Sequence, residues 1–350
     1  MRGALSYWAY LLCITVVAPV QANFLSHPEA KEAVLEWQQN LGLSPAQARR
    51  GLGQAQFNAQ AKRLMQPAPK GYVGNWAAYR ARFVEPVRIR AGAKAWRRWD
   101  AALRRAEQRY GVPAEVIMGV LGVETLYGRY MGRFATLDVL ATLAFDYPRE
   151  HPRWQARQAY FREQLGHFLL LADETGLAAT RWRGSYAGAL GLPQFMPGSW
   201  RRYAVDHSGD GRIGLRSNPA DAIGSVAHFL REHGWQPGVP ATFAVQPPLG
   251  DTASWQHLLA PDIVPSFSAA QLQAAGLKLG PQARAYKGEM ALVKVDNGPN
   301  AAPSYVLGTQ NFYALTRYNA SSYYARAVLD LGQAVRRAAR NPSPSPGHAH

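Results

Sequence analysis

The sequence predicts a mainly α-helical protein of the α+β class, in which helices form the core and one small module is mostly β. From Ala93 to Tyr110, tryptophan, leucine and alanine recur at helical spacing between arginines, which is typical of an amphipathic helix. The next segment, Val116–Val123, is apolar or glycine at every position, so a helix there would be buried on all sides. Between Trp235 and Leu307, prolines cluster and short alternating segments replace the helical pattern, which indicates the β module.

Residues 1–22 have the pattern of a secretory signal peptide. An arginine gives the positive start, Trp8 to Val20 form a largely apolar core, and Val20-Gln21-Ala22 offers a small-residue cleavage site. The apolar core is short for a membrane-spanning helix. Cys13 is the only cysteine, and Leu12 before it is not the small residue that lipidation needs. We therefore expect export to the periplasm without a lipid anchor, and a mature chain without disulfides.

Helix start and stop signals place the other elements. The region from 23 to 95 should be helical with irregular breaks, and Ser44-Pro45 is a plausible helix start within it. The expected helices are Glu29–Gln39, Ser44–Met65, Ala220–His233, Ser268–Ala275 and Ser321–Ala339, and the segment from Arg133 to Leu171 should continue as helices. Short strands are expected at Ala241–Val245 and Met290–Val295.

The chain is strongly basic. Among its 350 residues, 39 Lys and Arg stand against 23 Asp and Glu, which leaves a formal charge of +16 and indicates an anionic partner. Charge alone favours nucleic acid, but the arginines are scattered and no nucleic-acid-binding motif is present. Peptidoglycan also carries carboxylates, so the charge does not discriminate between these two partners.

Glu124 is the candidate catalytic residue, because it falls at the C-terminal end of the buried helix, just before Tyr127 and the expected terminator Gly128. A carboxyl group in that setting loses hydration, which raises its pKa. A carboxyl group that stays protonated near neutral pH is suited to general acid catalysis. A helix-end glutamate that faces solvent or pairs with Arg129 is the alternative, since structural ion pairs are commoner than catalytic acids.

A second segment, Gly184 to Pro197, has the composition of a sugar-binding site. Its glycines permit positive φ angles and a close approach of the backbone to a ligand. Ser185, Tyr186 and Gln194 supply hydrogen-bonding side chains, and the aromatic rings supply flat apolar faces. An ordinary glycine-rich helix entry is the alternative interpretation.

No convincing second carboxylate accompanies Glu124. Asp138, Asp146 and Asp173 follow it in the sequence, and Asp146 stands before Tyr147-Pro148, where an aspartate usually caps or turns the chain. Most glycosidases need a pair of carboxylates. One acid/base suffices when the attacking nucleophile belongs to the substrate.

A calcium loop is expected after residue 205. The expected metal ligands, at EF-hand loop positions one, three, five and seven, are Asp206, Ser208, Asp210 and the Arg212 carbonyl. Gly211 stands at position six, as that loop requires. The twelfth position is Ser217, which cannot supply a bidentate carboxylate, so Asp221 would complete a lengthened loop of modest affinity. A Gly/Asp turn without an ion is the alternative.

Taken together, these motifs resemble the membrane-bound lytic murein transglycosylase B family of the lysozyme-like superfamily. The resemblance covers about Phe57 to Leu331. The segments that carry it are 122–128, with Gly-Val-Glu-Thr-x-Tyr-Gly; 144–149, with Ala-Phe-Asp-Tyr-Pro-Arg; 184–197, with Gly-Ser-Tyr-Ala-Gly-Ala-Leu-Gly-x-Pro-Gln-Phe-Met-Pro; and 311–319. Four separated motifs in the right order make the resemblance specific.

The resemblance implies cleavage of the β-1,4 bond between N-acetylmuramic acid and N-acetylglucosamine, leaving 1,6-anhydro ends. Glu124 would protonate the glycosidic oxygen and then deprotonate the muramic C6 hydroxyl. The expected substrate-binding residues are Ser185, Tyr186, Gln194, Tyr318, Asn319 and Tyr324. Phe229 departs from the family, whose members tend to carry tyrosine there. The chemistry would need no cofactor, and calcium would be structural, as in the family's expanded calcium loop.

The implied organisation has a lysozyme-like catalytic core flanked by other regions. The expected parts are a signal peptide at 1–22, an N-terminal helical region at 23–95, the core with its EF-hand-like loop at 96–235, a small β module at 236–303, a return to the core with the C-terminal helix at 304–340, and a disordered tail at 341–350. We expect a monomer that binds peptidoglycan glycan strands and no nucleic acid, with other cell-wall enzymes or membrane-proximal proteins as further candidate partners.

Two other functions stay open. A peptidoglycan-binding protein without activity would need the same groove but not Glu124. A hydrolytic muramidase would need a water site and usually a second carboxylate.

Overall fold

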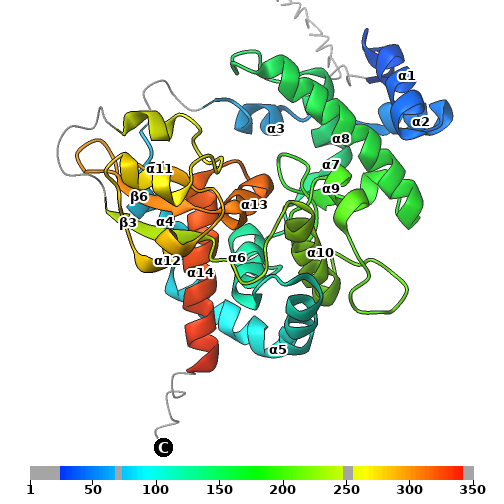
Figure 1. Cartoon of the computed structure of the whole chain (residues 1–350). Coiled ribbons are helices and arrows are strands. Elements are labelled where there is room, and N and C mark those ends of the chain that lie inside the picture. Colours follow the sequence, from blue (N-terminus) through cyan, green and yellow to red (C-terminus); the bar gives the residue numbers. More distant parts are fainter. Residues whose placement is uncertain (1–23, 68–72, 247–254, 342–350) are drawn as a thin grey trace, which may run out of the picture.

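The computed structural model describes residues 24–67, 73–246 and 255–341, and it is mainly helical with small antiparallel sheets (Figure 1). The predicted mainly α fold with a small β module is therefore confirmed. The predicted signal peptide lies outside the described residues, as does all of the predicted tail except Asn341. In the described parts of the chain, every helix is too short or too polar to cross a membrane.

The N-terminal region begins with the 3-10 helix η1 (Phe24–Ser26) and the helices α1 (Ala30–Leu41), α2 (Pro45–Gln54) and α3 (Ala59–Leu64). Ser44 starts α2 as predicted, because its side chain accepts a hydrogen bond from the Gln47 N–H and the Gln47 side chain accepts one from the Ser44 N–H. The helices α1 and α2 pack on α8 (Trp154–Thr175), and α3 packs on α7 (Thr136–Phe145).

The predicted helix Ser44–Met65 is in fact two helices, so this expectation was wrong. The backbone N–H groups between them bond to α7 instead of continuing a helix. Gln56 N–H donates to Asp138 at 2.9 Å, and Asn58 N–H donates to the Thr142 hydroxyl at 2.8 Å. Contacts between distant segments therefore override the local helical pattern.

Three helices lead to the candidate acid: α4 (Trp76–Phe83), α5 (Pro86–Tyr110) and α6 (Ala114–Thr125). The α5 helix begins seven residues before the predicted start at Ala93, because the Glu85 side chain accepts hydrogen bonds from the N–H groups of Val87 and Arg88 and caps it. Residue 95, the expected end of the N-terminal region, therefore lies inside one continuous helix.

The α6 helix is the centre of the fold, and all residues from Val116 to Val123 are buried, as predicted. It packs most extensively against α14 (Ser322–Arg340), and it also contacts α5 and α10 (Pro219–Glu232). Two glycines permit the close approach of α6 and α14. A Cβ at Gly119 would collide with the Val328 carbonyl, and a Cβ at Gly332 would collide with the Glu115 carbonyl.

A short antiparallel ribbon of β1 (Phe134–Ala135) and β2 (Arg183–Gly184) ties the segment after α6 to the glycine-rich segment. A 3-10 helix, η2 (Ala179–Arg181), precedes β2, and α9 (Pro197–Tyr203) follows the glycine-rich segment. The ribbon therefore holds two predicted site segments side by side.

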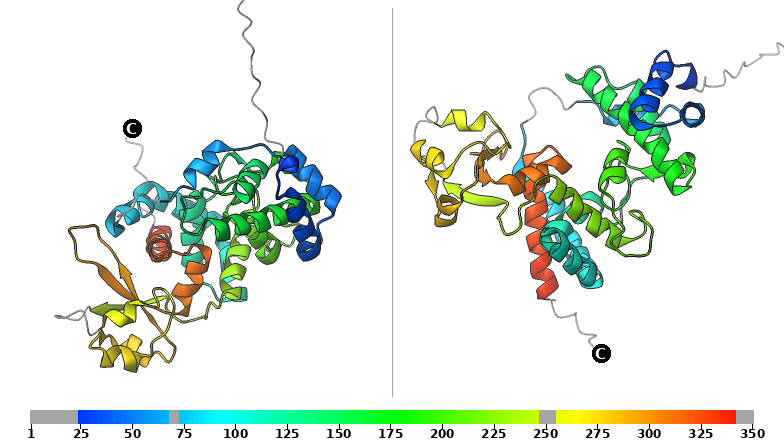
Figure 2. Two further views of the ribbon diagram at one scale, coloured as in Figure 1. Left: turned by 90° about the horizontal axis from the view of Figure 1, so that it is seen from above. Right: turned by 45° about the vertical axis from the view of Figure 1, so that its right-hand side comes forward.

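The β module is a four-stranded antiparallel sheet in the order β4-β3-β6-β5. Its elements are β3 (Thr242–Gln246), η4 (Gln256–Leu259), α11 (Ala269–Ala274), β4 (Lys278–Leu279), α12 (Pro281–Ala285), β5 (Ala291–Val295) and β6 (Ser304–Gly308). Figure 2 shows the module to one side of the helices. The sheet extends beyond the predicted module end at 303, because β6 pairs with β5 in the register Leu292↔Leu307. Then α13 (Gln310–Tyr318) and α14 return to the core.

Candidate active site

Glu124 stands next to the end of α6, where the chain reverses sharply. Leu126 and Tyr127 adopt left-handed conformations, with φ angles of 51° and 59°. The Leu126 N–H bonds to the Gly122 carbonyl at 3.2 Å and the Tyr127 N–H to the Leu121 carbonyl at 3.1 Å. The helix thus stops at Thr125, before the predicted terminator Gly128. A non-glycine residue in this conformation costs about 1–3 kcal/mol, and such strain clusters at functional sites.

The packing of Tyr127 accounts for this reversal. Its ring folds back against α5 and α6, where a Cβ at Gly92 or at Gly122 would collide with its hydroxyl. The two glycines therefore make the space that Tyr127 fills, and the turn after Glu124 is held by a buried aromatic ring.

The carboxyl group of Glu124 is half-buried and accepts a hydrogen bond from the Tyr324 hydroxyl at 2.7 Å. Burial raises the pKa of Glu124 to about 7, although the hydrogen bond from Tyr324 acts in the opposite direction. Much of this carboxyl group is therefore protonated near neutral pH. The alternative pairing with Arg129 does not form, because the Arg129 guanidinium lies over the Tyr130 ring at 5.4 Å.

Tyr318 and Tyr324 form an aromatic wall beside the carboxyl group. Their rings are nearly parallel, with an interplanar angle of 14° and centroids 6.2 Å apart. Burial and then the negative charge of Glu124 raise the pKa of both hydroxyl groups well above the ordinary value. The Tyr318 hydroxyl donates to the Pro193 carbonyl at 2.6 Å, which attaches α13 to the glycine-rich segment.

The glycine-rich segment is also fixed to the end of α6. The Thr125 hydroxyl donates to the Leu192 carbonyl at 2.9 Å and accepts a hydrogen bond from the Gly128 N–H. Gln194, with a φ of 50°, is another strained residue, and its amide donates to the carbonyls of Met131 at 3.3 Å and Gly191 at 2.8 Å. The segment is therefore held rigidly next to Glu124.

The other predicted sugar-binding residues either bond within the glycine-rich segment or are exposed. The Ser185 hydroxyl accepts hydrogen bonds from the N–H groups of Ala187 at 3.2 Å and Ala189 at 3.0 Å, so it shapes the turn of the glycine-rich segment. Tyr186 is 42% exposed, and Asn319 is exposed at the end of α13. Of the predicted residues, Tyr324 alone bonds directly to Glu124 in the described parts of the chain.

Tyr79 of α4 was not identified from the sequence. Burial and then the charge of Glu124 raise its pKa, which places it near the candidate acid. It packs edge-on against Tyr323, with ring centroids 5.6 Å apart, and beside Trp76 at 6.4 Å. The spacing of Trp76 and Tyr79 on one helix face was the only available signal, and it does not distinguish a site from a core contact.

The aspartates that follow Glu124 belong to structural contacts. Asp146 ends α7 and accepts a hydrogen bond from Lys62 at 2.7 Å, so it is a helix-end acid, as predicted. Asp138 accepts the Gln56 N–H bond described above, and burial raises its pKa. Both carboxylates face the N-terminal helices.

Phe229 stands in an aromatic cluster next to the tyrosine wall. Its ring stacks on His233 with centroids 4.0 Å apart, and it meets Tyr318 edge-on at 4.8 Å. It is 5% exposed. This position, where the family resemblance implies tyrosine, is thus apolar here and supports Tyr318 by packing.

The expected calcium loop brings its three aspartates together. Carboxylate oxygens of Asp206, Asp210 and Asp221 all lie within 4.8 Å of one another. Gly209 and Gly211 have φ angles of 81° and 80°, which lets the loop turn tightly around this point. A convergent set of oxygen donors fits Ca²⁺.

Hydrogen bonds hold these carboxylates in place. Asp221, on the first turn of α10, is buried and accepts bonds from the N–H groups of His207, Ser208 and Gly214 at 2.8–3.0 Å. The Gly209 N–H is the main cause that holds the pKa of Asp206 below its ordinary value. The Arg212 N–H donates to Asp210 at 2.9 Å, and the Ser208 hydroxyl accepts from Asn218 at 2.9 Å.

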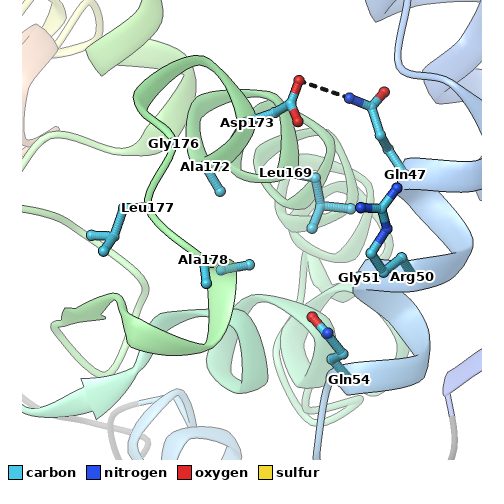
Figure 3. Close-up of a pocket in the computed structure, with 11 residues that line it drawn as sticks. Gln47, Arg50, Gly51, Gln54, Leu169, Ala172, Asp173, Gly176, Leu177 and Ala178 are labelled. Atoms are coloured by element: carbon cyan, nitrogen blue, oxygen red, sulfur yellow. Dashed lines mark hydrogen bonds between the residues drawn. The ribbon is translucent and has the colours of Figure 1, made fainter.

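A separate cavity of about 390 Å³ lies between α2 and α8 (Figure 3). Gln47 donates to Asp173 across it at 2.8 Å. None of the predicted site residues lines this cavity, so it is distinct from the site at Glu124.

Comparison with known proteins decides the family. The model of the transglycosylase SLT domain matches residues 27–333. The chain belongs to this transglycosylase family. It is 39% identical over 332 residues to membrane-bound lytic murein transglycosylase B of Escherichia coli (strain K12), a match that covers 91% of this chain and 86% of that protein.

Solved structures of lytic transglycosylases match the fold of this chain along most of its length. The Escherichia coli lytic transglycosylase Slt35 in complex with bulgecin A is 38% identical with a TM-score of 0.76, and the match covers 91% of this chain and 96% of that one. A structure of Slt35 in complex with calcium has a TM-score of 0.74, with the same identity and coverage. Soluble lytic transglycosylase SltB1 from Pseudomonas aeruginosa is 36% identical with a TM-score of 0.76, over 90% of this chain and 100% of that one.

These matches confirm three predictions for this transglycosylase. The family resemblance and the lysozyme-like fold are correct. The chain is a lytic transglycosylase, an enzyme that cleaves peptidoglycan.

Proposed function

We propose that Glu124 is the single acid and base of the lytic transglycosylase reaction. The observation that supports this most is a half-buried carboxyl group with a pKa of about 7, hydrogen-bonded to Tyr324 at the end of a helix whose residues from Val116 to Val123 are all buried. The best catalytic pKa lies near the working pH, since one group must both donate and accept a proton.

The proposed reaction returns the proton to Glu124 at the end of each cycle. The protonated carboxyl group gives its proton to the glycosidic oxygen as the bond from that oxygen to muramic C1 breaks. The resulting carboxylate takes the proton of the muramic C6 hydroxyl, whose oxygen bonds to C1 and closes the 1,6-anhydro ring. No water is consumed, so a second carboxylate to activate water is not needed.

Tyr324 has a defined part in this scheme. Its hydroxyl donates to the carboxylate that exists after the first proton transfer and therefore stabilises that form. We assign glycan contacts to Ser185, Tyr186, Gln194, Tyr318 and Asn319, because they belong to the glycine-rich segment, which is bonded to the end of α6, and to the end of α13.

We also propose that the loop before α10 binds a structural Ca²⁺ ion. Asp206, Asp210 and Asp221 would supply carboxylates, and the Ser208 hydroxyl and Arg212 carbonyl would supply further oxygens. The ion would offset the repulsion among the carboxylates and hold the loop before α10. The Slt35 structure in complex with calcium supports this assignment.

We also assign the protein to the periplasm, on the evidence of its signal-peptide pattern and of its activity on cell-wall peptidoglycan, and we expect it to act as a monomer. The glycan strands are its substrate, and other cell-wall enzymes are candidate partners.

Replacement of Glu124 by glutamine tests the acid/base assignment. Glu124→Gln keeps the shape but removes the transferable proton, so release of soluble muropeptides from purified sacculi should fall by at least about 10²–10⁴-fold. Glu115→Gln is the matched control, because it makes the same change at the other end of α6, where Glu115 pairs with Arg336. The control should keep near wild-type activity, and binding to sacculi should survive in both variants.

Mass spectrometry of the wild-type products completes the test. Anhydro ends and reducing ends differ by one water, so reducing ends would favour a hydrolytic muramidase. Near wild-type activity in Glu124→Gln would make the assignment wrong, and Asp138 and Asp146 would be tested next. A wild-type protein that binds sacculi and releases nothing would favour the binding-protein alternative.

A further inference from the structure

Helix α4 is held at its two ends by different parts of the molecule. At its first turn, the Trp76 N–H donates to the Asp296 carbonyl at 2.8 Å. At its last turn, the Arg80 side chain pairs with Asp330 of α14 at 2.6 Å. The start of α4 is therefore bonded to the β module, and its end is bonded to a core helix (Figure 1).

The part of the β module that contacts α4 is the turn between β5 and β6, residues 296–303, which we call the hairpin turn. A second bond joins it to the chain before α4, because the Gly298 N–H donates to the Gly74 carbonyl at 3.0 Å. The Asn297 side chain holds the turn together, since its amide donates to the Ala302 carbonyl at 2.7 Å. Asn297 therefore shapes the turn that fixes the start of α4.

Tyr323, on the first turn of α14, takes part in the same contact. Its hydroxyl donates to the Asp296 carbonyl at 2.9 Å, and this is the oxygen that also accepts the Trp76 N–H. A Cβ at Gly74 would collide with the Tyr323 hydroxyl, so glycine at this position leaves room for it. One carbonyl of the β module thus joins α4 to α14.

This contact reaches the active site through Tyr79. The Tyr79 ring lies about one helical turn after Trp76 and meets Tyr323 edge-on, with ring centroids 5.6 Å apart. The negative charge of Glu124 contributes to the raised pKa of Tyr79, and Tyr79 contributes to the raised pKa of Tyr324. A chain of contacts therefore runs from the hairpin turn through Tyr323 and Tyr79 to the acid.

We propose that the β module is a positioning element of the active site, which acts through the hairpin turn and Tyr323 to hold Tyr79 beside Glu124 and to keep water from its carboxyl group. The inference rests on the proposed role of Glu124 as the acid. Burial is the main cause that raises the pKa of Glu124. If α4 moved outward, water would hydrate the carboxylate, and the pKa would fall toward its ordinary value.

Three tyrosines interact with Glu124, and each is held differently. They are Tyr79 of α4, Tyr318 of α13 and Tyr324 of α14. Tyr318 bonds to the Pro193 carbonyl and Tyr324 to Glu124 itself, whereas Tyr79 is placed by the packing of α4. The described helices α5 and α10 also pack against α6, and no charged side chain of either is among the causes that shift the pKa of Glu124.

A pH–rate profile of the mature enzyme on soluble glycan strands tests this proposal. Asn297→Ala loosens the hairpin turn, and Tyr323→Phe removes the bond to the Asp296 carbonyl. Each should move the alkaline limb of kcat/KM to lower pH by about 0.5–1 unit, which is the size of effect that one such hydrogen bond can have. Well below the limb, where Glu124 is protonated in every variant, kcat/KM should stay near the wild-type value.

Asn300→Ala is the matched control. Asn300 is exposed in the same hairpin turn, and its side chain forms no hydrogen bond with any described residue. The change of side chain is the same as in Asn297→Ala, so the alkaline limb of the control should keep its wild-type position. Circular dichroism and a thermal melt verify that every variant is folded at the assay temperature.

A double-mutant cycle tests whether Tyr323 acts through Tyr79. Tyr79→Ala removes the ring from beside Glu124 and should also move the alkaline limb to lower pH. If both changes disturb one chain of contacts, the limb of Tyr79→Ala/Tyr323→Phe should lie within about 0.3 pH unit of the limb of Tyr79→Ala alone.

Three results would overturn the proposal. One is an alkaline limb that stays in place or rises in Asn297→Ala and Tyr323→Phe. Another is an equal loss of kcat/KM at every pH, since that would show a purely structural role. The third is a pair of shifts that add in the double variant. Failure of the acid assignment itself is a separate result, because it requires near wild-type activity in Glu124→Gln.

Discussion

Glu124 is subject to two opposing influences on its proton. Burial favours the neutral acid and the hydrogen bond from Tyr324 favours the carboxylate, and burial prevails because the pKa rises from 4.5 to about 7. A shift of that size corresponds to at most about 3–4 kcal/mol of differential stability between the two forms. The folded protein therefore holds this proton more tightly than the unfolded chain, and Glu124 makes it less stable as the pH rises from about 4.5 through 7.

Replacement of Tyr324 by phenylalanine should shift the pH dependence of the enzyme. Tyr324→Phe removes the donor that favours the carboxylate, so the pKa of Glu124 should rise further. The alkaline limb of kcat/KM reports loss of the essential proton in the free enzyme, and it should move upward by about one pH unit. The measurement is a pH–rate profile on soluble glycan strands.

Tyr160→Phe on α8 serves as the control for this profile, because Tyr160 is exposed and belongs to a helix that carries no proposed site residue. Its alkaline limb should stay at the wild-type position. An unmoved or lowered limb in Tyr324→Phe would contradict the role assigned to this hydrogen bond.

At the scale of helices and strands, the crossing of α6 and α14 sets the position of the Glu124 carboxyl group. Glu124 comes from the first helix and Tyr324 from the second, so their 2.7 Å contact depends on how closely the helices pack. That closeness rests on Gly119 and Gly332, where any side chain meets a backbone carbonyl of the partner helix. Backbone atoms cannot rotate away as side-chain ends can, so the crossing tolerates little added volume.

Gly332→Ala should therefore both destabilise and slow the enzyme. Overpacking of this kind costs about 1–3 kcal/mol, and a small displacement of Tyr324 from Glu124 should lower kcat roughly tenfold or more. Gly53→Ala on α2 is the control, because its new methyl group meets only the end of the Leu25 side chain. Denaturant unfolding and sacculus digestion measure both effects; wild-type stability for Gly332→Ala would refute the close-packing argument.

The calcium loop is a second element with its own test. A ligand that binds only the folded state raises the melting temperature, so millimolar Ca²⁺ added after chelator treatment should stabilise the wild type. Asp210→Ala should abolish this rise with little effect on the calcium-free protein, because Asp210 is exposed and accepts only local bonds. Asp221→Ala should lower the melting temperature even without calcium, because the buried Asp221 side chain accepts hydrogen bonds from three backbone N–H groups.

Glu150→Ala, an exposed carboxylate outside the loop, should keep the full response to calcium. A melting curve of the wild type that calcium leaves unmoved would show that the loop is only a turn.

At the scale of the whole molecule, the N-terminal helices are fastened to the catalytic core by contacts between distant residues. The Trp37 indole donates to the Arg162 carbonyl at 2.9 Å, and Glu29 pairs with the Arg162 side chain. These contacts hold the first described helices against α8.

N-terminal sequencing of the exported protein should find a mature chain that begins at about Asn23 and carries no lipid. The physical basis is the short apolar segment before Val20-Gln21-Ala22, together with Leu12 in place of a small residue before Cys13. A blocked N-terminus with an acylated Cys13, seen by mass spectrometry, would reverse this prediction.

The sequence by itself predicted what depends on neighbours along the chain. The buried helix, the position of Glu124 at its end, the Ser44 helix start and the spacing of the aspartates in the calcium loop all follow from residues within a few turns of each other. Periodicity, capping and ligand spacing are local properties, so one sequence is enough to recognise them.

The tertiary structure alone decided what depends on distant segments. Tyr79 lies near Glu124 because α4 folds back toward α14, and the region between α2 and α3 is extended because its N–H groups find acceptors on α7. Tyr324 was expected from the family resemblance, but its bond to Glu124 depends on the glycine-mediated approach of two helices that are far apart in the chain. Such contacts have no local pattern, since packing selects them only once the elements have formed.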